Sequence, residues 1–265
     1  MKSILWLHYI VIIIGLAMGL QSFSVQSKEL IACGHPYYPP VSWVQNKKLV
    51  GLAPAVVKII FAELGYQVKL DKVGNWKRCL SEVKTGHADI VVAAYKIVSR
   101  ESYFHFSEQY IVADPIGVYV NPRRNKTYHS LNVLKGKTAG LLFGDSFGDR
   151  LDKFMDDNNR IEYVSEGQQN FKKLSQGRID FMPLGILTGQ LQTEKFGYSK
   201  QIIVAPFKLE TEYYYLALSR HSKLSHHFPY INKRLNELHE NGQIQTLVTK
   251  YSQIYLESSA EGDLP

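Results

Sequence analysis

A glycine-containing motif, Gly144-Asp145-Ser146-Phe147-Gly148, is the first candidate for chemistry in this sequence. It fits the G-x-S-x-G turn that exposes a nucleophilic serine in α/β-hydrolases, because an apolar stretch precedes it and a predicted helix follows it. A hydrolase would also need an acid and a histidine downstream, and no HGGG-type oxyanion motif lies upstream. Asp180 could serve as the acid, and the candidate histidines are His221, His226, His227 and His239.

The same motif has a second interpretation, which we favour. Small residues that open a helix present backbone N–H groups, and the positive end of the helix dipole attracts a carboxylate there. Residues 144–148 are therefore predicted to hold an anion, with an ordinary turn as the remaining alternative. In this interpretation Ser146 donates a hydrogen bond and is not a nucleophile.

Arg100 is the residue that we predict to capture a ligand. It follows a predicted buried strand, residues 88–94, by a short loop, and ligands of open parallel sheets bind beyond the carboxyl ends of the strands. A guanidinium can hold a carboxylate with two parallel hydrogen bonds. The alternative is a surface arginine paired with Glu101 or Glu108. Three aromatic residues near strand ends are candidate pocket walls: Trp43, Trp76 and Tyr95.

The histidines do not have the spacing of metal ligands. Three of them lie in a polar segment beside Pro229, and His239-Glu240 is not followed by the second histidine of a zinc-protease motif. The sequence contains no P-loop and no G-x-G-x-x-G motif. We therefore expect neither a metal ion nor a cofactor.

The elements that position these residues alternate between strands and helices. A loop rich in proline, residues 35–40, follows the first predicted strand. Apolar spacing predicts, in order, a strand over 30–33, a helix over 54–64, a strand over 67–73, a helix over 76–84 and a strand over 88–94. This order predicts an α/β fold with a mostly parallel sheet flanked by helices. Later segments predict strands over 138–143 and 213–218 and helices over 150–155, 228–239 and 242–251.

One pattern occurs twice. Leu80-x-x-Val83-x-x-Gly86-x-x-Asp89 and Phe171-x-x-Leu174-x-x-Gly177-x-x-Asp180 each combine a helix end, a glycine stop, an aspartate turn and a strand start. The copies are 91 residues apart, as counted from Asp89 to Asp180. This separation indicates two successive lobes rather than a solenoid. A polar stretch between the copies, residues 121–126, is the predicted start of the second lobe.

The N-terminus has the layout of a secretory signal: Lys2, an apolar run to Leu20, and polar residues from Gln21 onward. We predict a signal peptide over residues 1–27. Cleavage before Val25 and an uncleaved anchor are the alternatives, although the densest apolar run is short for a bilayer span of about 20 residues. The full chain has a net charge of +7, which becomes +6 without Lys2. This charge is spread along the chain, so it suits an anionic ligand and indicates no nucleic-acid partner.

Cys33 and Cys79 are the only cysteines. In an oxidising compartment such a pair predicts a disulfide, with two free buried thiols as the alternative. Residues 30–33 also fit the sequence pattern of a lipoprotein box. We reject that interpretation because Lys28 and Glu29 separate the box from the apolar run that it should directly follow.

Over residues 30–255 the chain resembles the bacterial extracellular solute-binding proteins of family 3, the polar amino-acid type found as periplasmic components of ABC importers. Five segments in order carry this resemblance: Tyr38–Trp43 with Gly51-Leu52, Trp76–Arg78 with Gly86–Asp89, Ala93–Arg100 with Phe106–Tyr110, Gly140–Ser146, and Gly177–Asp180.

The resemblance implies two α/β lobes joined by two crossover strands, closing around a ligand. Lobe 1 would comprise residues 28–118 plus 210–265, and lobe 2 residues 119–209. It also implies that Arg100 holds the ligand carboxylate. An early aromatic residue and the helix start at Trp76 would form one wall, and the loop from the second lobe would donate hydrogen bonds. The further candidate binding residues are Tyr38, Asp145, Ser146 and Phe147.

Two departures from the family pattern bear on the ligand. Ile97-Val98-Ser99 replaces the usual Thr-Pro-Glu before the arginine, and Leu184-Gly185 lacks the acidic residue that often holds an α-amino group. Either the ligand has no free amino group or another residue, such as Asp145, holds it.

We therefore expect a monomeric periplasmic binding protein, not an enzyme, for a small anionic or zwitterionic ligand. Its macromolecular partner would be an inner-membrane ABC permease or a sensor. An orphan sensory receptor of the same fold is the first alternative, and an enzyme, either the hydrolase above or a dehydratase-like derivative, is the second.

Overall fold

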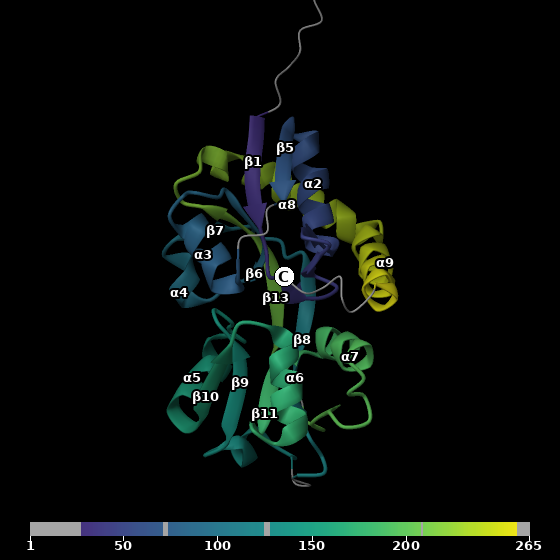
Figure 1. Ribbon diagram of the computed structural model, residues 1–265. Coiled ribbons are helices and arrows are strands. Elements are labelled where there is room, and N and C mark those ends of the chain that lie inside the picture. The colour runs from purple at the N-terminus through teal and green to yellow at the C-terminus, as the bar shows by residue number, and fades with distance from the viewer. Residues whose placement is uncertain (1–27, 71–73, 125–127, 208, 259–265) are drawn as a thin grey trace, which may run out of the picture.

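The computed structural model of the chain describes residues 28–70, 74–124, 128–207 and 209–258. These residues form two lobes, one above the other in Figure 1, connected by two long strands. The predicted signal peptide lies outside the described residues.

Lobe 1 contains the elements from β1 to β7 and the C-terminal helices. Its centre is a parallel arrangement in which β1 pairs with both β5 and β6. Helix α2 buries Val56, Val57, Ile60 and Phe61, the helical spacing that predicted it. The bounds are β1 (Lys28–Cys33), α2 (Leu52–Glu63), β5 (Tyr66–Leu70), α3 (Trp76–Lys84), β6 (Ile90–Tyr95), α4 (Val98–Glu101), β7 (Phe104–Phe106), η2 (Lys223–His227), α8 (Phe228–Glu240) and α9 (Gln243–Glu257).

A small antiparallel sheet lies between β1 and α2 in the chain. The loop that the sequence predicts over residues 35–40 contains its first strand, which is only two residues long. The strands are β2 (Tyr37–Tyr38), β3 (Ser42–Gln45) and β4 (Lys48–Val50). Strands this short depend on pairing with their neighbours, which the local sequence does not reveal.

Lobe 2 repeats the α/β arrangement. Strand β9 pairs in parallel with β10 and β11. The elements are η1 (Leu131–Leu134), β9 (Thr138–Leu142), α5 (Asp149–Asn158), β10 (Arg160–Val164), α6 (Gly167–Gln176), β11 (Phe181–Gly185), α7 (Ile186–Lys195) and β12 (Ile203–Val204).

Two antiparallel strands, β8 (Val112–Val120) and β13 (Thr211–Ser219), connect the lobes. Strand β8 also pairs with β11 of lobe 2, and β13 pairs with β6 of lobe 1, so one sheet runs through the whole molecule in the order β10-β9-β11-β8-β13-β6-β1-β5. In this register Glu212 lies opposite Asp114. The predicted lobe boundaries fall on β8 and just before β13, and their positions remain a prediction.

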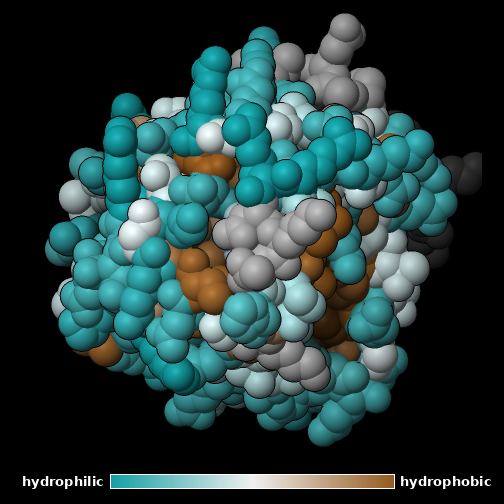
Figure 2. All heavy atoms as spheres, turned by 90° about the horizontal axis from the view of Figure 1, so that it is seen from below, coloured by the Kyte–Doolittle hydropathy of each residue, from teal (hydrophilic) through white to brown (hydrophobic). Residues whose placement is uncertain are grey.

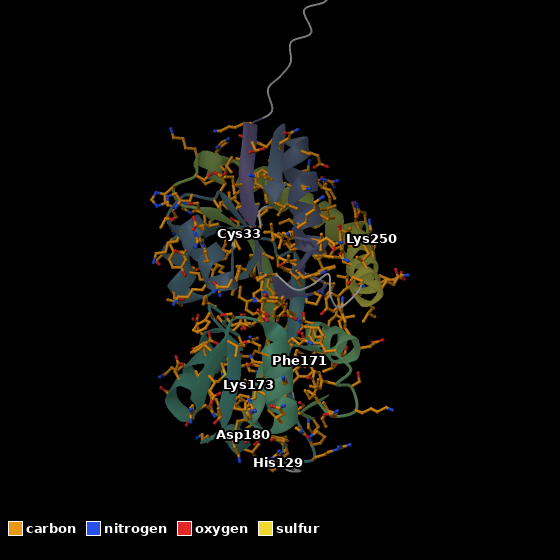
Figure 3. The ribbon with its side chains drawn as sticks, in the orientation of Figure 1. Cys33, His129, Phe171, Lys173, Asp180 and Lys250 are labelled. Atoms are coloured by element: carbon orange, nitrogen blue, oxygen red, sulfur yellow. A yellow bond between two sulfur atoms is a disulfide. The ribbon has the colours of Figure 1, made fainter. Side chains whose placement is uncertain are left out.

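The repeated sequence pattern has the same structural role in both lobes. Asp89 accepts a hydrogen bond from the Ile31 backbone N–H (2.9 Å) and donates its own N–H to the Ile31 carbonyl (2.8 Å). Asp180 does the same with Thr138, at 2.8 Å for both bonds. Asp180 lies on lobe 2 below the core residue Phe171 in Figure 3. Each aspartate therefore fixes a helix–strand junction to the first strand of its lobe.

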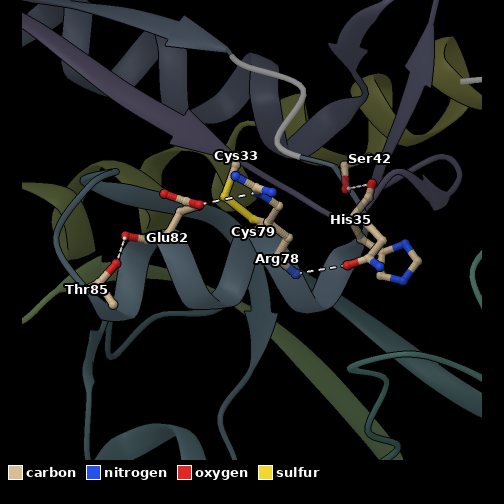
Figure 4. Close-up of a disulfide and its surroundings, with 8 residues drawn as sticks. Cys33, His35, Ser42, Arg78, Cys79, Glu82 and Thr85 are labelled. Carbon is tan, nitrogen blue, oxygen red and sulfur yellow. Dashed lines mark hydrogen bonds and ion pairs between the residues drawn. A yellow bond between two sulfur atoms is a disulfide. The ribbon is translucent and has the colours of Figure 1, made fainter.

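The structure joins Cys33, at the end of β1, to Cys79 of α3 by a disulfide with Cα atoms 5.8 Å apart (Figure 4). Both residues are fully buried. The bond ties helix α3 to the central strand of lobe 1, directly before the loop that begins at Gly34 and His35.

The outer surface of lobe 2 is mainly polar. In the view from below, hydrophilic residues cover most of the surface and apolar residues appear in hollows between them (Figure 2). No helix among the described residues has the length and apolarity that a membrane span requires.

Candidate functional site

A small cavity of about 20 Å³ lies between the lobes, at the carboxyl ends of β1, β6 and β9. A wider groove of about 660 Å³ shares Arg100, Asp145 and Ser146 with it. Seven of the eight predicted binding residues line the cavity; only Trp43 does not. The lining residues are His35, Tyr38, Trp76, Tyr95, Arg100, Asp145, Ser146, Phe147 and Tyr214.

Arg100 is buried, with 3% of its surface exposed. Its guanidinium donates to the Tyr95 carbonyl in lobe 1 (3.2 Å) and to the Gly144 carbonyl in lobe 2 (3.1 Å), and it lies 5.6 Å from the centre of the Trp76 ring. No carboxylate of the described residues lies within 4 Å of it in an ion pair. Burial lowers the pKa of Arg100, as expected for a cation removed from water.

The alternative for Arg100, a surface ion pair with a neighbouring glutamate, is wrong. Glu101 pairs instead with Lys96 at 3.5 Å, and the backbone N–H of Glu108 binds Asn232. Arg100 lies in the short helix α4 and its side chain points inward. One carbonyl that it binds is at the end of the preceding strand, and the other is in the opposite lobe.

Asp145 contacts His35 across the cleft. The His35 Nε2 atom lies 3.1 Å from the Asp145 carboxylate, and both side chains are less than a tenth exposed. The Tyr37 N–H donates to His35 Nδ1, which leaves Nε2 as the donor to Asp145. The other Asp145 oxygen accepts from the Leu142 N–H (3.1 Å). The carboxylate that could hold a ligand ammonium is thus already hydrogen-bonded by the protein.

The loop over residues 144–148 is not the open anion site that the sequence predicts. The Phe147 N–H and the Ser146 hydroxyl both donate to Asp152 of α5, at 2.8 and 2.5 Å. The Gly148 N–H donates to Ser146 Oγ, and the Asp145 N–H donates to the Leu142 carbonyl. The anion that this helix start holds is therefore a side chain of its own first turn, and burial raises the pKa of Asp152.

The same geometry argues against the hydrolase interpretation. A serine nucleophile needs a base, usually histidine, within hydrogen-bond reach. Ser146 donates to a carboxylate, and no histidine of the described chain hydrogen-bonds it. One nominated residue, His239, binds the Tyr110 carbonyl instead.

A second carboxylate, Asp114 of β8, lies beside the cavity and is 5% exposed. It accepts hydrogen bonds from the hydroxyls of Tyr38 (3.0 Å) and Tyr95. The Tyr38 hydroxyl in turn accepts from the Gly185 N–H (2.7 Å). Burial raises the pKa of Asp114 to about 6, although the tyrosine hydroxyls oppose the shift. Burial and the neighbouring Asp114 raise the pKa of Tyr38 and Tyr95, so both remain donors.

Trp43 corrects a prediction, because it is not a wall of the cavity. It is 1% exposed and packs edge-on against Tyr251 and Tyr255 of α9, together with Leu191 of α7. Successive side chains of a strand point to opposite faces, and β3 directs Trp43 toward these helices. The residue helps to join the lobes on the side of α7, where Thr188 Oγ1 also donates to the Pro39 carbonyl (2.6 Å).

Sequence reasoning did not select three residues of this region: His35, Asp114 and Tyr214. A charged residue inside an otherwise apolar strand, as in Val112–Val120, is the signal that could have identified Asp114. The described residues contain no group of three or more His, Cys, Asp or Glu side chains that could hold a metal ion.

The comparisons with known proteins identify a family. The sequence model of the bacterial extracellular solute-binding proteins, family 3, matches residues 30–254. No curated protein sequence matches the chain.

Solved structures share the fold at low sequence identity. An amino acid ABC transporter substrate-binding protein from Streptococcus pneumoniae, bound to L-arginine, has a TM-score of 0.75 at 21% identity, over 87% of this chain and 97% of that one. An ancestral arginine-binding protein bound to arginine gives 0.71 at 22%, over 84% and 97%. A histidine kinase sensor domain similar to periplasmic binding proteins gives 0.71 at 16%, over 85% and 96%.

Proposed function

This chain belongs to the bacterial extracellular solute-binding proteins of family 3, and on that premise we propose that it is a periplasmic receptor that captures a small carboxylate-bearing ligand between its lobes. Binding would shift an equilibrium between open and closed arrangements of the lobes. The disulfide of lobe 1 is consistent with an oxidising compartment such as the periplasm.

The observation that carries this proposal is the state of Arg100. A buried cation is costly unless an opposite charge compensates it. The carbonyl oxygens of Tyr95 and Gly144 hydrogen-bond this guanidinium but carry no full charge. Asp145 and Asp152 favour the charged guanidinium but form no ion pair with it. A ligand carboxylate in the adjoining groove would be its direct charged partner. The two carbonyls belong to opposite lobes, so Arg100 can hydrogen-bond both of them only when the cleft is closed.

The partner of the closed form is an ABC permease in this proposal. A sensor is the second candidate, because a histidine kinase sensor domain shares this fold over 85% of the chain. Copurification of the ligand-loaded protein with detergent-solubilised inner membranes distinguishes the two, since the co-isolated membrane protein would be a permease or a kinase.

A thermal-shift screen of carboxylates and amino acids is the first test. A ligand at 100 times its dissociation constant adds about 2.7 kcal/mol to stability. Calorimetry on Arg100→Ala should then show a loss of about 2–5 kcal/mol of binding free energy, the usual cost of removing one partner of a buried charge pair. Arg100→Lys should also bind poorly, because an ammonium cannot reproduce the planar fork.

The matched control is Arg160→Ala, which removes an arginine whose side chain is 77% exposed on lobe 2. Its affinity should equal that of the unmodified protein. Circular dichroism checks that each variant is folded. Unchanged affinity in folded Arg100→Ala would contradict the proposal.

A further inference from the structure

The groove beside Arg100 is much larger than the cavity beyond it, about 660 Å³ against about 20 Å³. Small-molecule sites typically measure about 300–1,000 Å³. The cavity leaves no room for more than a ligand's head group, so the body of any ligand that reaches Arg100 must lie in the groove. The residues lining the groove should therefore determine which carboxylate binds.

Two exposed aromatic rings form part of this lining. Phe143 follows β9 and Tyr163 belongs to the neighbouring strand β10; their rings are stacked, 5.5 Å apart and 18° from parallel. The two residues are 39% and 45% exposed, and neither belongs to a hydrophobic core cluster of the described residues. Exposed apolar side chains that gather in a groove mark a ligand-binding surface. Each ring already stacks on the other, and the aromatic surface that remains exposed favours a further aromatic ring.

The rings lie close to the proposed carboxylate site. Gly144, whose carbonyl accepts the hydrogen bond from Arg100, directly follows Phe143. A Cβ atom built at Gly144 would lie about 3 Å from the backbone of Lys77, so helix α3 approaches the loop closely at this point. Arg100 and Phe143 line the same groove, so a ligand whose carboxylate meets Arg100 can extend over Phe143.

The charges of the groove favour an anion without an ammonium group. The cations Lys77 and Lys84 of α3 line it together with Arg100. Its two carboxylates, Asp145 and Asp152, are both hydrogen-bonded within the protein. The lining thus offers positive charge and aromatic surface.

We propose that the groove binds an aromatic carboxylate, with the carboxylate at Arg100 and the ring against the exposed aromatic surface of the Phe143–Tyr163 pair. This inference rests on the proposed function and adds the class of ligand to it.

Calorimetry with two matched acids, benzoate and cyclohexanecarboxylate, tests the role of the ring. 3-Phenylpropionate extends the series, and L-arginine and L-glutamine represent amino acids. We expect the aromatic acids to bind more tightly than the saturated acid and the amino acids.

The variants Phe143→Leu and Tyr163→Leu keep apolar surface but remove the π face. Each should weaken the aromatic acids about three- to tenfold and leave cyclohexanecarboxylate unchanged. The control is Tyr213→Leu, a tyrosine that is 37% exposed and is not part of the groove lining, and it should change nothing.

Different results would overturn this inference and the proposed function. Tighter binding of the amino acids or the saturated acid, absence of binding by every aromatic acid, or equal affinity in the leucine variants overturns the aromatic ligand. The proposed function is instead decided by the loss of affinity in Arg100→Ala for whichever acid binds.

Discussion

The carboxylate of Asp114 occupies the space that a side chain at residue 185 would need. A Cβ atom built at Gly185 would lie within 3 Å of both carboxylate oxygens of Asp114. The identities of residues 185 and 114 therefore depend on each other, because the Asp114 carboxylate of β8 lies where a side chain at 185 would be. This carboxylate is not exposed to the cleft, because the hydroxyls of Tyr38 and Tyr95 cover it.

The variant Gly185→Ala should lower the free energy of unfolding by about 1–3 kcal/mol, since the added methyl must displace a buried carboxylate and its hydrogen bonds. In an Asp114→Ala background the same methyl has room. The double-mutant cycle should therefore show a favourable coupling of about 1–2 kcal/mol in urea unfolding.

The control for this cycle is Gly167→Ala in α6. A Cβ atom there meets its nearest neighbours at the ordinary distance of 3.5 Å or more. Its stability should change by less than about 1 kcal/mol. Strictly additive effects at residues 114 and 185 would contradict the steric coupling.

Asp114 should make stability depend on pH. Its pKa rises from 3.8 in the unfolded chain to about 6 in the folded protein, mainly through burial. Between these values the folded state binds more protons than the unfolded state, so stability falls as the pH increases. The shift of roughly two units corresponds to about 3 kcal/mol, present below pH 4 and lost above pH 6.

The test is Asp114→Asn, which keeps an oxygen acceptor for the tyrosines but cannot ionise. Urea unfolding of both proteins should be measured at pH 4, 5, 6 and 7. Across this range the unfolding free energy of the variant should rise by about 3 kcal/mol relative to that of the unmodified protein. A difference that stays constant with pH would show that Asp114 does not titrate in this way.

The sequence predicted the regular elements of lobe 1 well, because local signals define them. Helix α3 begins at Trp76, as predicted, since the preceding Asn75 side chain accepts from the Arg78 N–H (3.0 Å). The repeated pattern that ends in Asp89 and in Asp180 indicated two lobes. Each aspartate hydrogen-bonds the first strand of its own lobe in the same way.

The site was less predictable, because its key residues depend on contacts between distant segments. Asp114 is covered by tyrosines 76 and 19 residues away in the chain, and Trp43 is buried by α7 and α9, which follow much later. In the loop at residues 144–148, the Phe147 N–H and the Ser146 hydroxyl both donate to Asp152. An acidic residue in the first turn of the following helix was visible in the sequence, but whether it or a ligand would take those donors depends on the tertiary fold.

Removing the disulfide should destabilise lobe 1. The chain-entropy model gives about 4 kcal/mol for a closed loop of this size, 46 residues in separation, and measured losses are typically 2–4 kcal/mol. Unfolding of Cys33→Ala/Cys79→Ala by urea measures the loss. The matched comparison is the oxidised, unmodified protein, and equal unfolding free energies of the two would show that the bond contributes nothing.

Ser146 should not react as a nucleophile. Its hydroxyl donates to Asp152 at 2.5 Å, and no described histidine is placed to take its proton. Incubation of the protein with a fluorophosphonate probe should therefore leave its intact mass unchanged, while a serine hydrolase in the same solution is labelled. Ser146→Ala should instead reduce stability by about 1–3 kcal/mol, because the half-buried Asp152 carboxylate loses a charge-assisted hydrogen bond. Stoichiometric labelling that disappears in Ser146→Ala would contradict the binding role of this loop and support the hydrolase.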